Sequence, residues 1–219
     1  MRTVAGRRAR RHEPSALAET EVKGLAPEIE DLPSRLRRET ADLHSAVETA
    51  TGHPGSVRSR LDYLSLLYRL HGFHQAAEVA LADPRWADEW AEFALDPRRY
   101  RRAHLLENDI QAMQAPRPGP ATPFGGIDDF PTALGCLYVV EGSALGGRVI
   151  GPAIRSAIGD VPTSFFGSAG RGHPSPWRSL REALRRFGDG ADCAAVVEGA
   201  RLTFLAFERR VAAPLKERA

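Results

Sequence analysis

A cluster of glycines inside an apolar helical run is the feature that most constrains how this chain folds. The run extends from about Asp129 to Ile158, and Gly142, Gly146 and Gly147 fall near its middle. Each glycine in a helix interior costs about 0.5–1 kcal/mol relative to alanine. We therefore expect a helix that bends at this point, or one whose backbone must come close to something bulky or flat.

The remainder of the chain also follows helical spacing, and no alternating strand pattern of useful length occurs. Proline- and glycine-rich segments at 115–128 and 159–176 are predicted loops. Ser34 is expected to cap the first helix and Pro152 to kink the long apolar one again. Helices are predicted at about 34–50, 57–82 (with Leu61, Leu64, Leu67, Tyr68 and Phe73 on its apolar side), 86–93, 97–115, 129–158, 177–187 and 190–213. The sequence thus predicts an all-α, single-domain bundle of about seven helices.

The length of the chain and the distribution of its charge indicate how it is divided into domains. The 219 residues suit one domain, which we place at residues 33–219. Residues 1–32 are expected to be a basic, disordered extension, because residues 1–12 hold five arginines and no acidic residue. The basic run 98–102 is expected to be a solvated helix end, so no nucleic-acid partner is predicted. No secretory signal and no apolar run of about 20 residues is present, so no membrane partner is predicted.

The two cysteines, Cys136 and Cys193, lie in apolar helical surroundings without the spacing of metal ligands. They are expected to be buried thiols in a reducing compartment, with the cytoplasm as the expected location.

His44 is the strongest candidate for a metal ligand. It lies beside Leu43 and Val47 on an apolar stripe, so its imidazole is expected to point inward. Glu48 follows one turn later, where its carboxylate can accept the Nδ1 proton and leave Nε2 free for a metal. Arg37 lies two turns earlier, where it can bind a ligand carboxylate. The histidine alone favours a hydrogen-bonded core residue, but these neighbours indicate a site for an anionic metal macrocycle.

Gly142 and Gly146 are four residues apart and therefore share one helix face, which Gly147 widens. Missing side chains there would let the backbone contact a planar group. Close packing between helices uses the same spacing, and the glycines alone favour that alternative. Their combination with a suitable histidine on another helix favours a ligand slot.

The absence of several other motifs excludes several classes of enzyme. His71, His74 and Glu78 share one helix, but the chain contains no Glu-x-x-His pair of the kind a di-iron carboxylate bundle uses. We expect these histidines to be core or partly exposed residues. No serine-histidine-aspartate pattern, phosphate-binding loop or Cys-x-x-Cys motif occurs.

The histidine block and the glycine block together resemble the haem oxygenase family, specifically its bacterial, phytochrome-associated branch that makes biliverdin. The resemblance covers about residues 33–215 and rests on three blocks, Leu36–Glu48, Leu134–Gly147 and Gly199–Glu208. They resemble that family's proximal helix, distal helix and last core helix, in this order.

The resemblance implies that haem lies between the first helix and the kinked distal helix. His44 would be the axial iron ligand, Glu48 its hydrogen-bonding partner, and Arg37 and Arg201 the contacts to the haem propionates. It also implies catalytic roles for Gly142, Ser143 and Gly146, and haem contacts from Tyr138, Gly142, Gly146, Gly147 and Phe204.

The implied reaction is the oxidative opening of haem to biliverdin, iron and carbon monoxide, with haem as substrate and cofactor and molecular oxygen as oxidant. No flavin or iron–sulfur motif is present, so the electrons would come from an external donor, a small electron-transfer protein or another reductant. A bacteriophytochrome is the implied acceptor of biliverdin.

Ser143 departs from the pattern of many family members, which carry aspartate directly after the first distal glycine. A serine can hydrogen-bond but cannot hold a charge. Two alternatives therefore stay open. One is a non-catalytic haem carrier or sensor on the same fold. The other is a haem-free relative acting on a thiamin-like compound, which would need acidic groups and Cys136 in a central pocket.

Overall fold

The computed structural model describes residues 30–51, 55–168, 176–188 and 192–212. The expected extension therefore lies almost wholly outside the described residues. Within them the chain is all helical, as predicted, but it forms nine α-helices rather than about seven, with three short 3-10 turns. The helices are α1 Leu32–Glu39, α2 Ala41–Thr51, α3 Arg60–Leu81, α4 Ala87–Glu92, α5 Ala103–Ala112, α6 Phe130–Leu145, α7 Gly147–Ile158, α8 Pro176–Phe187 and α9 Asp192–Ala212; the 3-10 turns are η1 Pro84–Trp86, η2 Pro97–Tyr100 and η3 Phe166–Ser168.

The first predicted helix is two helices. Asp31, not Ser34, is the N-cap of α1, and its carboxylate accepts the Ser34 backbone N–H at 2.9 Å. Pro33 occupies the first turn, where its missing N–H has no consequence. The Thr40 hydroxyl donates to the Leu36 carbonyl at 2.7 Å, a side-chain bond that bends helices, and α2 starts directly after it.

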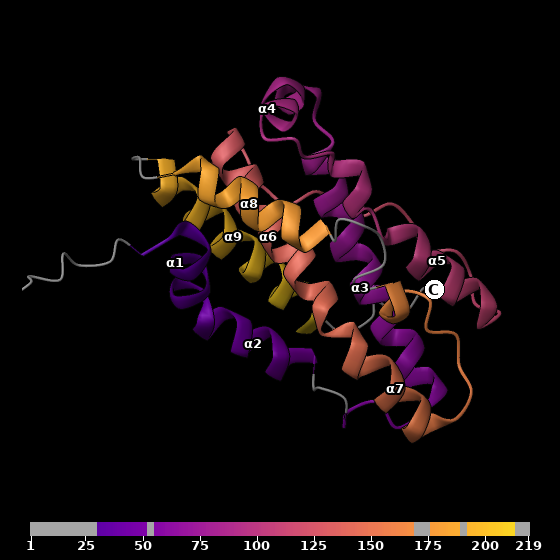
Figure 1. The fold of residues 1–219 in the computed structure, drawn as a ribbon. Helices are drawn as coiled ribbons and strands as arrows, with labels where there is room; N and C mark the ends of the chain where they lie inside the picture. Colours follow the sequence, from indigo (N-terminus) through magenta and orange to yellow (C-terminus); the bar gives the residue numbers. More distant parts are fainter. Residues whose placement is uncertain (1–29, 52–54, 169–175, 189–191, 213–219) are drawn as a thin grey trace, which may run out of the picture.

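Helices α6 and α9 lie side by side through the middle of the bundle (Figure 1). Glycines allow this close approach. A Cβ built on Gly135 would lie 2.1 Å from the Val196 carbonyl oxygen, and one on Gly199 would lie 2.3 Å from the Thr132 carbonyl oxygen. Side chains at either position would push the two backbones apart. Close packing of the kind that the sequence suggested for the glycine cluster therefore also occurs outside that cluster, at Gly135 and Gly199.

The predicted bend in the long apolar helix is confirmed. Helices α6 and α7 meet at Gly146 at an angle of 42°. Asp129 caps α6 through a reciprocal bond with Thr132, which fixes where that helix begins. Pro152 lies inside α7, which continues through it without ending.

The neighbouring helix α3 differs from its prediction at one position. Ser59 caps it, and Leu67 and Phe73 are fully buried. Leu61, however, is 72% exposed and does not belong to the apolar side.

Both cysteines are free and buried, as expected. Among the described helices, none alone is long and apolar enough to cross a membrane; α6 and α7 pass that test only as a bent pair.

Candidate functional site

A cavity of about 550 Å³ opens between α1 and α2 on one side and α6 and α7 on the other. This volume is within the range of small-molecule sites. Helix α3 and the segment around η3 close its inner end, where the lining side chains are buried and mostly apolar. The cavity brings together most of the residues predicted for the site, namely Arg37, His44, Glu48, Tyr138, Gly142, Ser143, Gly146 and Phe204.

His44 lies on α2 at the open side of the cavity. Its side chain is 56% exposed, so it faces the cavity instead of the protein core. The ring contacts the Phe204 ring edge-on, with centroids 5.9 Å apart. Nδ1 lies 3.7 Å from Glu48 Oε1, which is too long for a hydrogen bond and short enough for one to form after a small side-chain rotation.

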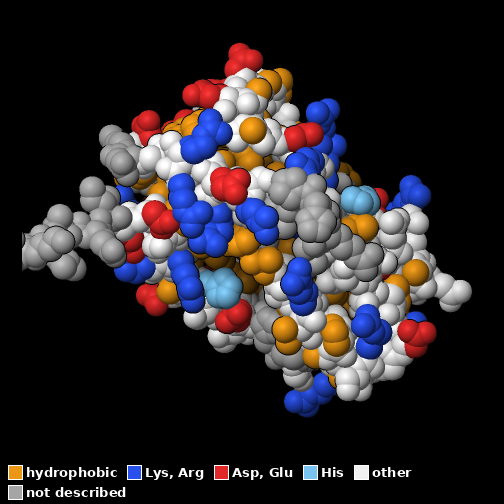
Figure 2. Space-filling view, in the orientation of Figure 1, with side chains coloured by type: hydrophobic (Ala, Val, Ile, Leu, Met, Phe, Trp, Pro, Cys, Tyr) orange, Lys and Arg blue, Asp and Glu red, His pale blue; other side chains and the backbone are white. Residues whose placement is uncertain are grey.

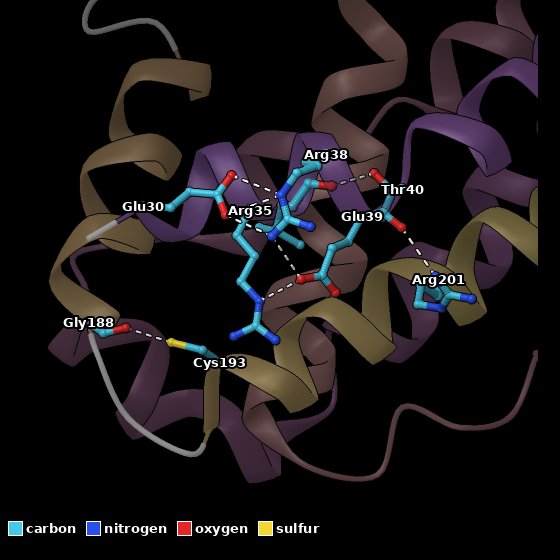
Figure 3. A network of polar contacts seen from close by, with 9 residues as sticks. Glu30, Arg35, Arg38, Glu39, Thr40, Gly188, Cys193 and Arg201 are labelled. Carbon is cyan, nitrogen blue, oxygen red and sulfur yellow. Dashed lines mark hydrogen bonds and ion pairs between the residues drawn. The ribbon is translucent and has the colours of Figure 1, made fainter. Parts of the chain in front are cut away.

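Arg37 and Arg201 differ in how freely they can meet an anion. Arg37 is exposed, lines the cavity, and has no ion-pair partner among the residues the structure describes. Arg201 instead donates to the Glu39 backbone carbonyl at 3.2 Å (Figure 3). Arg201 is not among the lining residues, so the structure does not bring it to the cavity with the other predicted site residues.

The other charged side chains near Arg37 hold the end of α1. Arg35 donates to Glu39 at 2.8 Å, and Arg38 pairs with Glu30 at 2.7 Å (Figure 3). Beyond α1, Figure 2 shows further arginine side chains gathered over α8, beside a patch of hydrophobic ones.

The three glycines of the cluster separate into two kinds. A Cβ on Gly142 would find only a Trp177 ring carbon, at 3.9 Å, and one on Gly146 would meet Ile150 Cδ1 at 3.5 Å. Both line the cavity, so a side chain there would protrude into it. Gly147 instead packs against η3, where a Cβ would lie 2.7 Å from the Phe166 carbonyl oxygen. The structure thus places Gly147 outside the predicted bare surface, because that close contact already uses its missing side chain.

Ser143 lines the cavity but turns its hydroxyl back to its own helix. Its Oγ donates to the Val140 carbonyl at 2.7 Å. The hydroxyl proton is therefore already used in a hydrogen bond, and Ser143 can act toward a bound ligand only as an acceptor.

Aromatic rings form much of the wall between α6 and α9. Tyr138 packs against Trp177 with centroids 5.7 Å apart, and Phe204 lies across from them on α9. Burial raises the pKa of Tyr138 above its usual value, which keeps the phenol neutral.

Just before Gly142, a buried ion pair fixes the glycine-bearing helix. Glu141 Oε2 accepts from Arg102 Nη2 at 2.8 Å, and both side chains are more than nine-tenths buried. Burial raises the pKa of Glu141, while Arg102 opposes that rise. The pair ties α6 to the start of α5, which holds the cavity wall in place.

Sequence reasoning missed several lining residues. Phe165 and Phe166 follow from no helical pattern, because they lie in a predicted loop, and Trp177, at the start of a predicted helix, was not assigned to the site. The sequence signal that could have found the two phenylalanines is that they are adjacent aromatic residues inside a glycine- and proline-rich segment.

His74 was expected to be a core or a partly exposed residue; it is fully buried, and it also lines the cavity. Neither ring nitrogen has a hydrogen-bond partner. Burial, with the charges of Arg102 and His71, lowers the pKa of His74 to about 3. His71, also buried, differs because its Nε2 lies 3.0 Å from Glu107 Oε1.

This low pKa predicts acid sensitivity. Below about pH 6.5 the unfolded chain binds a proton at His74, because the pKa of an unperturbed histidine is about 6.5. The folded protein binds this proton only below about pH 3. Between pH 7 and pH 5 the free energy of unfolding should fall by about 2 kcal/mol from this residue alone. Urea unfolding at several pH values should show a shallower pH dependence in His74→Phe than in the unchanged protein; equal slopes would contradict the assignment.

The thiol required by the thiamin-like alternative is not in the cavity. Cys136 is fully buried outside the lining, and burial raises its pKa to about 12. Glu48 is the one carboxylate among the described lining residues. No group of three or more potential metal-ligating side chains occurs within the described residues.

The helical bundle with a cavity between its N-terminal helices and a glycine-bent helix defines the class of fold. That fold is the one found in haem oxygenases. A crystal structure of the NO- and CO-bound haem oxygenase from Neisseria meningitidis matches with a TM-score of 0.66 and 19% sequence identity, over 84% of this chain and 91% of that one. No family model and no curated protein sequence matches the chain.

Proposed function

We propose that this chain binds haem in the cavity, with His44 as the axial iron ligand, and cleaves it oxidatively to biliverdin, iron and carbon monoxide. The observation that carries the proposal is the meeting of two distant sequence blocks: the His44 imidazole and the bare backbone at Gly142 and Gly146 line the same cavity. The fold of the solved haem oxygenase supports it.

The lining residues fit haem in charge, shape and polarity. The inner walls are apolar and aromatic, as a porphyrin requires, and the open side carries Arg37, which can pair with a propionate carboxylate. The space above Gly142 is one that a Cβ would enter. A flat ligand can therefore lie against this helix more closely than against any helix with side chains there.

Haem, when bound, would supply both the iron that activates molecular oxygen and the macrocycle that is oxidised. The protein's part is positional. His44 offers a nitrogen lone pair, and Glu48, once rotated into hydrogen-bond range, holds the ring by accepting its Nδ1 proton. Tyr138, Trp177 and Phe204 line the cavity and would exclude water from a bound porphyrin.

The co-reactants belong to the same proposal. Molecular oxygen is the oxidant, an external electron donor supplies the electrons, and the excised ring carbon leaves as carbon monoxide. Transfer of biliverdin to a bacteriophytochrome rests only on the resemblance of the sequence blocks.

One observation favours a second candidate, a haem carrier or sensor without turnover. The Ser143 proton is donated to the Val140 carbonyl, so this position offers neither a charge nor a free donor beside the cavity. A carrier would bind haem equally well and leave it intact.

A haem titration followed by reduction tests the function. The purified protein should bind haem stoichiometrically with the absorbance spectrum of a histidine-ligated ferric haem. Addition of ascorbate in air should then convert this spectrum to that of a bilin, with release of carbon monoxide. Tight binding without bilin would establish the carrier instead, and failure to bind haem would refute both.

A further inference from the structure

A second cavity, of about 420 Å³, lies between α3, α9 and the segment 115–128. A volume of this size is within the range of small-molecule sites. The segment runs from one helix to the other. At its start the Tyr68 hydroxyl of α3 donates to the Pro116 carbonyl, and further along the Arg210 guanidinium of α9 donates to the Thr122 carbonyl. These two bonds hold the segment as the outer wall of the second cavity.

The second cavity is distinct from the one proposed for haem, and no described residue lines both. Phe124 lines the second cavity, and Phe207 lines the first. The buried Phe73 ring stacks on both of them. Its centroid is 6.3 Å from that of Phe124 and 4.0 Å from that of Phe207, with interplanar angles of 4° and 9°. A stack of three rings therefore separates the two sites.

The second cavity gathers positive charge without a matching negative charge. Arg69, Arg209 and Arg210 line it, and no aspartate or glutamate occurs among its described lining residues. None of the three guanidiniums forms an ion pair within the part of the chain that the structure describes. Burial alone lowers the pKa of Arg210. Like charges repel, so an anion bound among the three side chains would remove an unfavourable interaction.

Backbone carbonyls fix two of these arginines and leave most of their donors unused. Arg69 Nη1 donates to the Val211 carbonyl at 2.7 Å, and Arg210 Nη2 donates to the Thr122 carbonyl. A guanidinium has five N–H donors in a planar fork that matches carboxylate and phosphate groups. Arg209 is exposed and makes no hydrogen bond within the described residues. The three side chains therefore present unused donors to one space.

We propose that the second cavity binds a small organic anion, a carboxylate or phosphate group attached to a flat ring. The guanidiniums bind the acidic group through charge-assisted hydrogen bonds. The ring lies against Tyr68 and Phe124, whose positions are fixed by a hydrogen bond to the backbone and by the stack on Phe73. Gly72 leaves room for the ring, since a Cβ there would meet only Arg210 Nη1, at 3.5 Å. This site is independent of haem and of the function proposed above.

Titration calorimetry of the full-length protein without haem tests the proposal with probes that separate the charge from the ring. Phenyl phosphate and benzoate each carry a ring and an acidic group, and at least one of them should bind with a dissociation constant below about 1 mM. The tighter of the two identifies the acidic group. Phenol, which is neutral, and inorganic phosphate, which has no ring, should each bind at least about tenfold more weakly. Equal binding of phenol, or no binding of either acid, would overturn the proposal.

Substitutions at Arg209 locate the binding site, because this side chain is exposed and its loss should not unfold the chain. The dissociation constant of the tighter probe should rise about tenfold or more in Arg209→Ala, and Arg209→Glu should abolish binding. Arg37→Ala is the matched control, since Arg37 is also an exposed arginine but lines the haem cavity. Unchanged affinity in both Arg209 variants, or an equal loss in Arg37→Ala, would show that the anion binds elsewhere and refute the assignment.

Haem provides a separate control. A protein saturated with haem should bind the probe with the same affinity, and Arg209→Glu should bind haem normally, because the ring stack separates the two cavities. Competition between haem and the probe would place the anion in the first cavity and rule out the second site. If haem fails to bind, the function proposed above is refuted but the calorimetric result stands, so the two failures are distinguishable.

Discussion

Replacing His44 with alanine is expected to remove the histidine-ligated haem spectrum and to abolish bilin formation. The imidazole is on the open side of the cavity, 56% exposed, and within the part of the chain that the structure describes its ring contact is with Phe204 and its charged neighbour is Glu48. Alanine therefore deletes the proposed iron ligand without deleting a core contact. Stability should change little, and haem binding should change most.

The control variants separate ligation from general damage. His104 lies exposed on α5, outside the cavity lining, so His104→Ala should bind haem normally. Added imidazole should enter the space left in His44→Ala and restore part of the histidine-type spectrum. A His44→Ala protein with an unchanged spectrum would sink the assignment, and the same assay on His74→Phe would then ask whether His74 is the ligand.

The structure explains which parts of the fold the sequence could predict. The bend between α6 and α7 followed from glycine chemistry, because three glycines within six residues remove the side-chain packing that keeps a helix straight. The break between α1 and α2 could not be predicted from helical spacing, because it depends on the hydrogen bond that the Thr40 hydroxyl donates to the Leu36 carbonyl. Leu61 was misplaced for a different reason. It lies in the first turn of α3, and its exposure of 72% depends on tertiary packing rather than on helical spacing.

Within the site, the groupings predicted most reliably were those of residues close together in the sequence. His44, Glu48 and Arg37 lie on adjoining turns, and Gly142 and Gly146 share a face, so local periodicity was sufficient to group them. That the two groups line one cavity depends on tertiary packing, which the family resemblance suggested and periodicity could not. The state of His74 also depends on tertiary packing, because a buried histidine and a cavity-lining one have the same sequence pattern.

The role of each glycine was the least predictable property of all. Spacing alone made Gly147 equivalent to Gly146, yet one packs under η3 and the other faces the cavity. The glycines that permit close helix contact, Gly135 and Gly199, were not predicted, because Gly135 lies seven residues before Gly142 and Gly199 is the one glycine of α9. What distinguishes these positions is the neighbouring backbone, and this leads to the second large expected effect.

Gly199→Ala is expected to destabilise the protein although alanine is the better helix former. Helix propensity alone would favour the substitution by about 0.5–1 kcal/mol. The new Cβ, however, would lie 2.3 Å from the Thr132 carbonyl oxygen and 2.5 Å from its Cα, and these are backbone atoms that cannot rotate away. Overpacking of this kind typically costs about 1–3 kcal/mol, which outweighs the gain. The melting temperature should fall by about 2–4 °C for each kcal/mol lost.

Gly72→Ala provides the matched control inside another helix. Its Cβ would lie 3.5 Å from Arg210 Nη1, an ordinary contact with the end of a flexible side chain, so this variant should be neutral or slightly more stable. The pair also tests how the bundle supports the cavity. Relief of the clash at Gly199 must move α6, and Gly142 lies two turns along α6 from Gly135, which packs against the same stretch of α9. Gly199→Ala should therefore weaken haem binding as well as stability, whereas Gly72→Ala should leave both unchanged. Equal stability of the two variants would mean that α6 and α9 do not approach each other as closely as described.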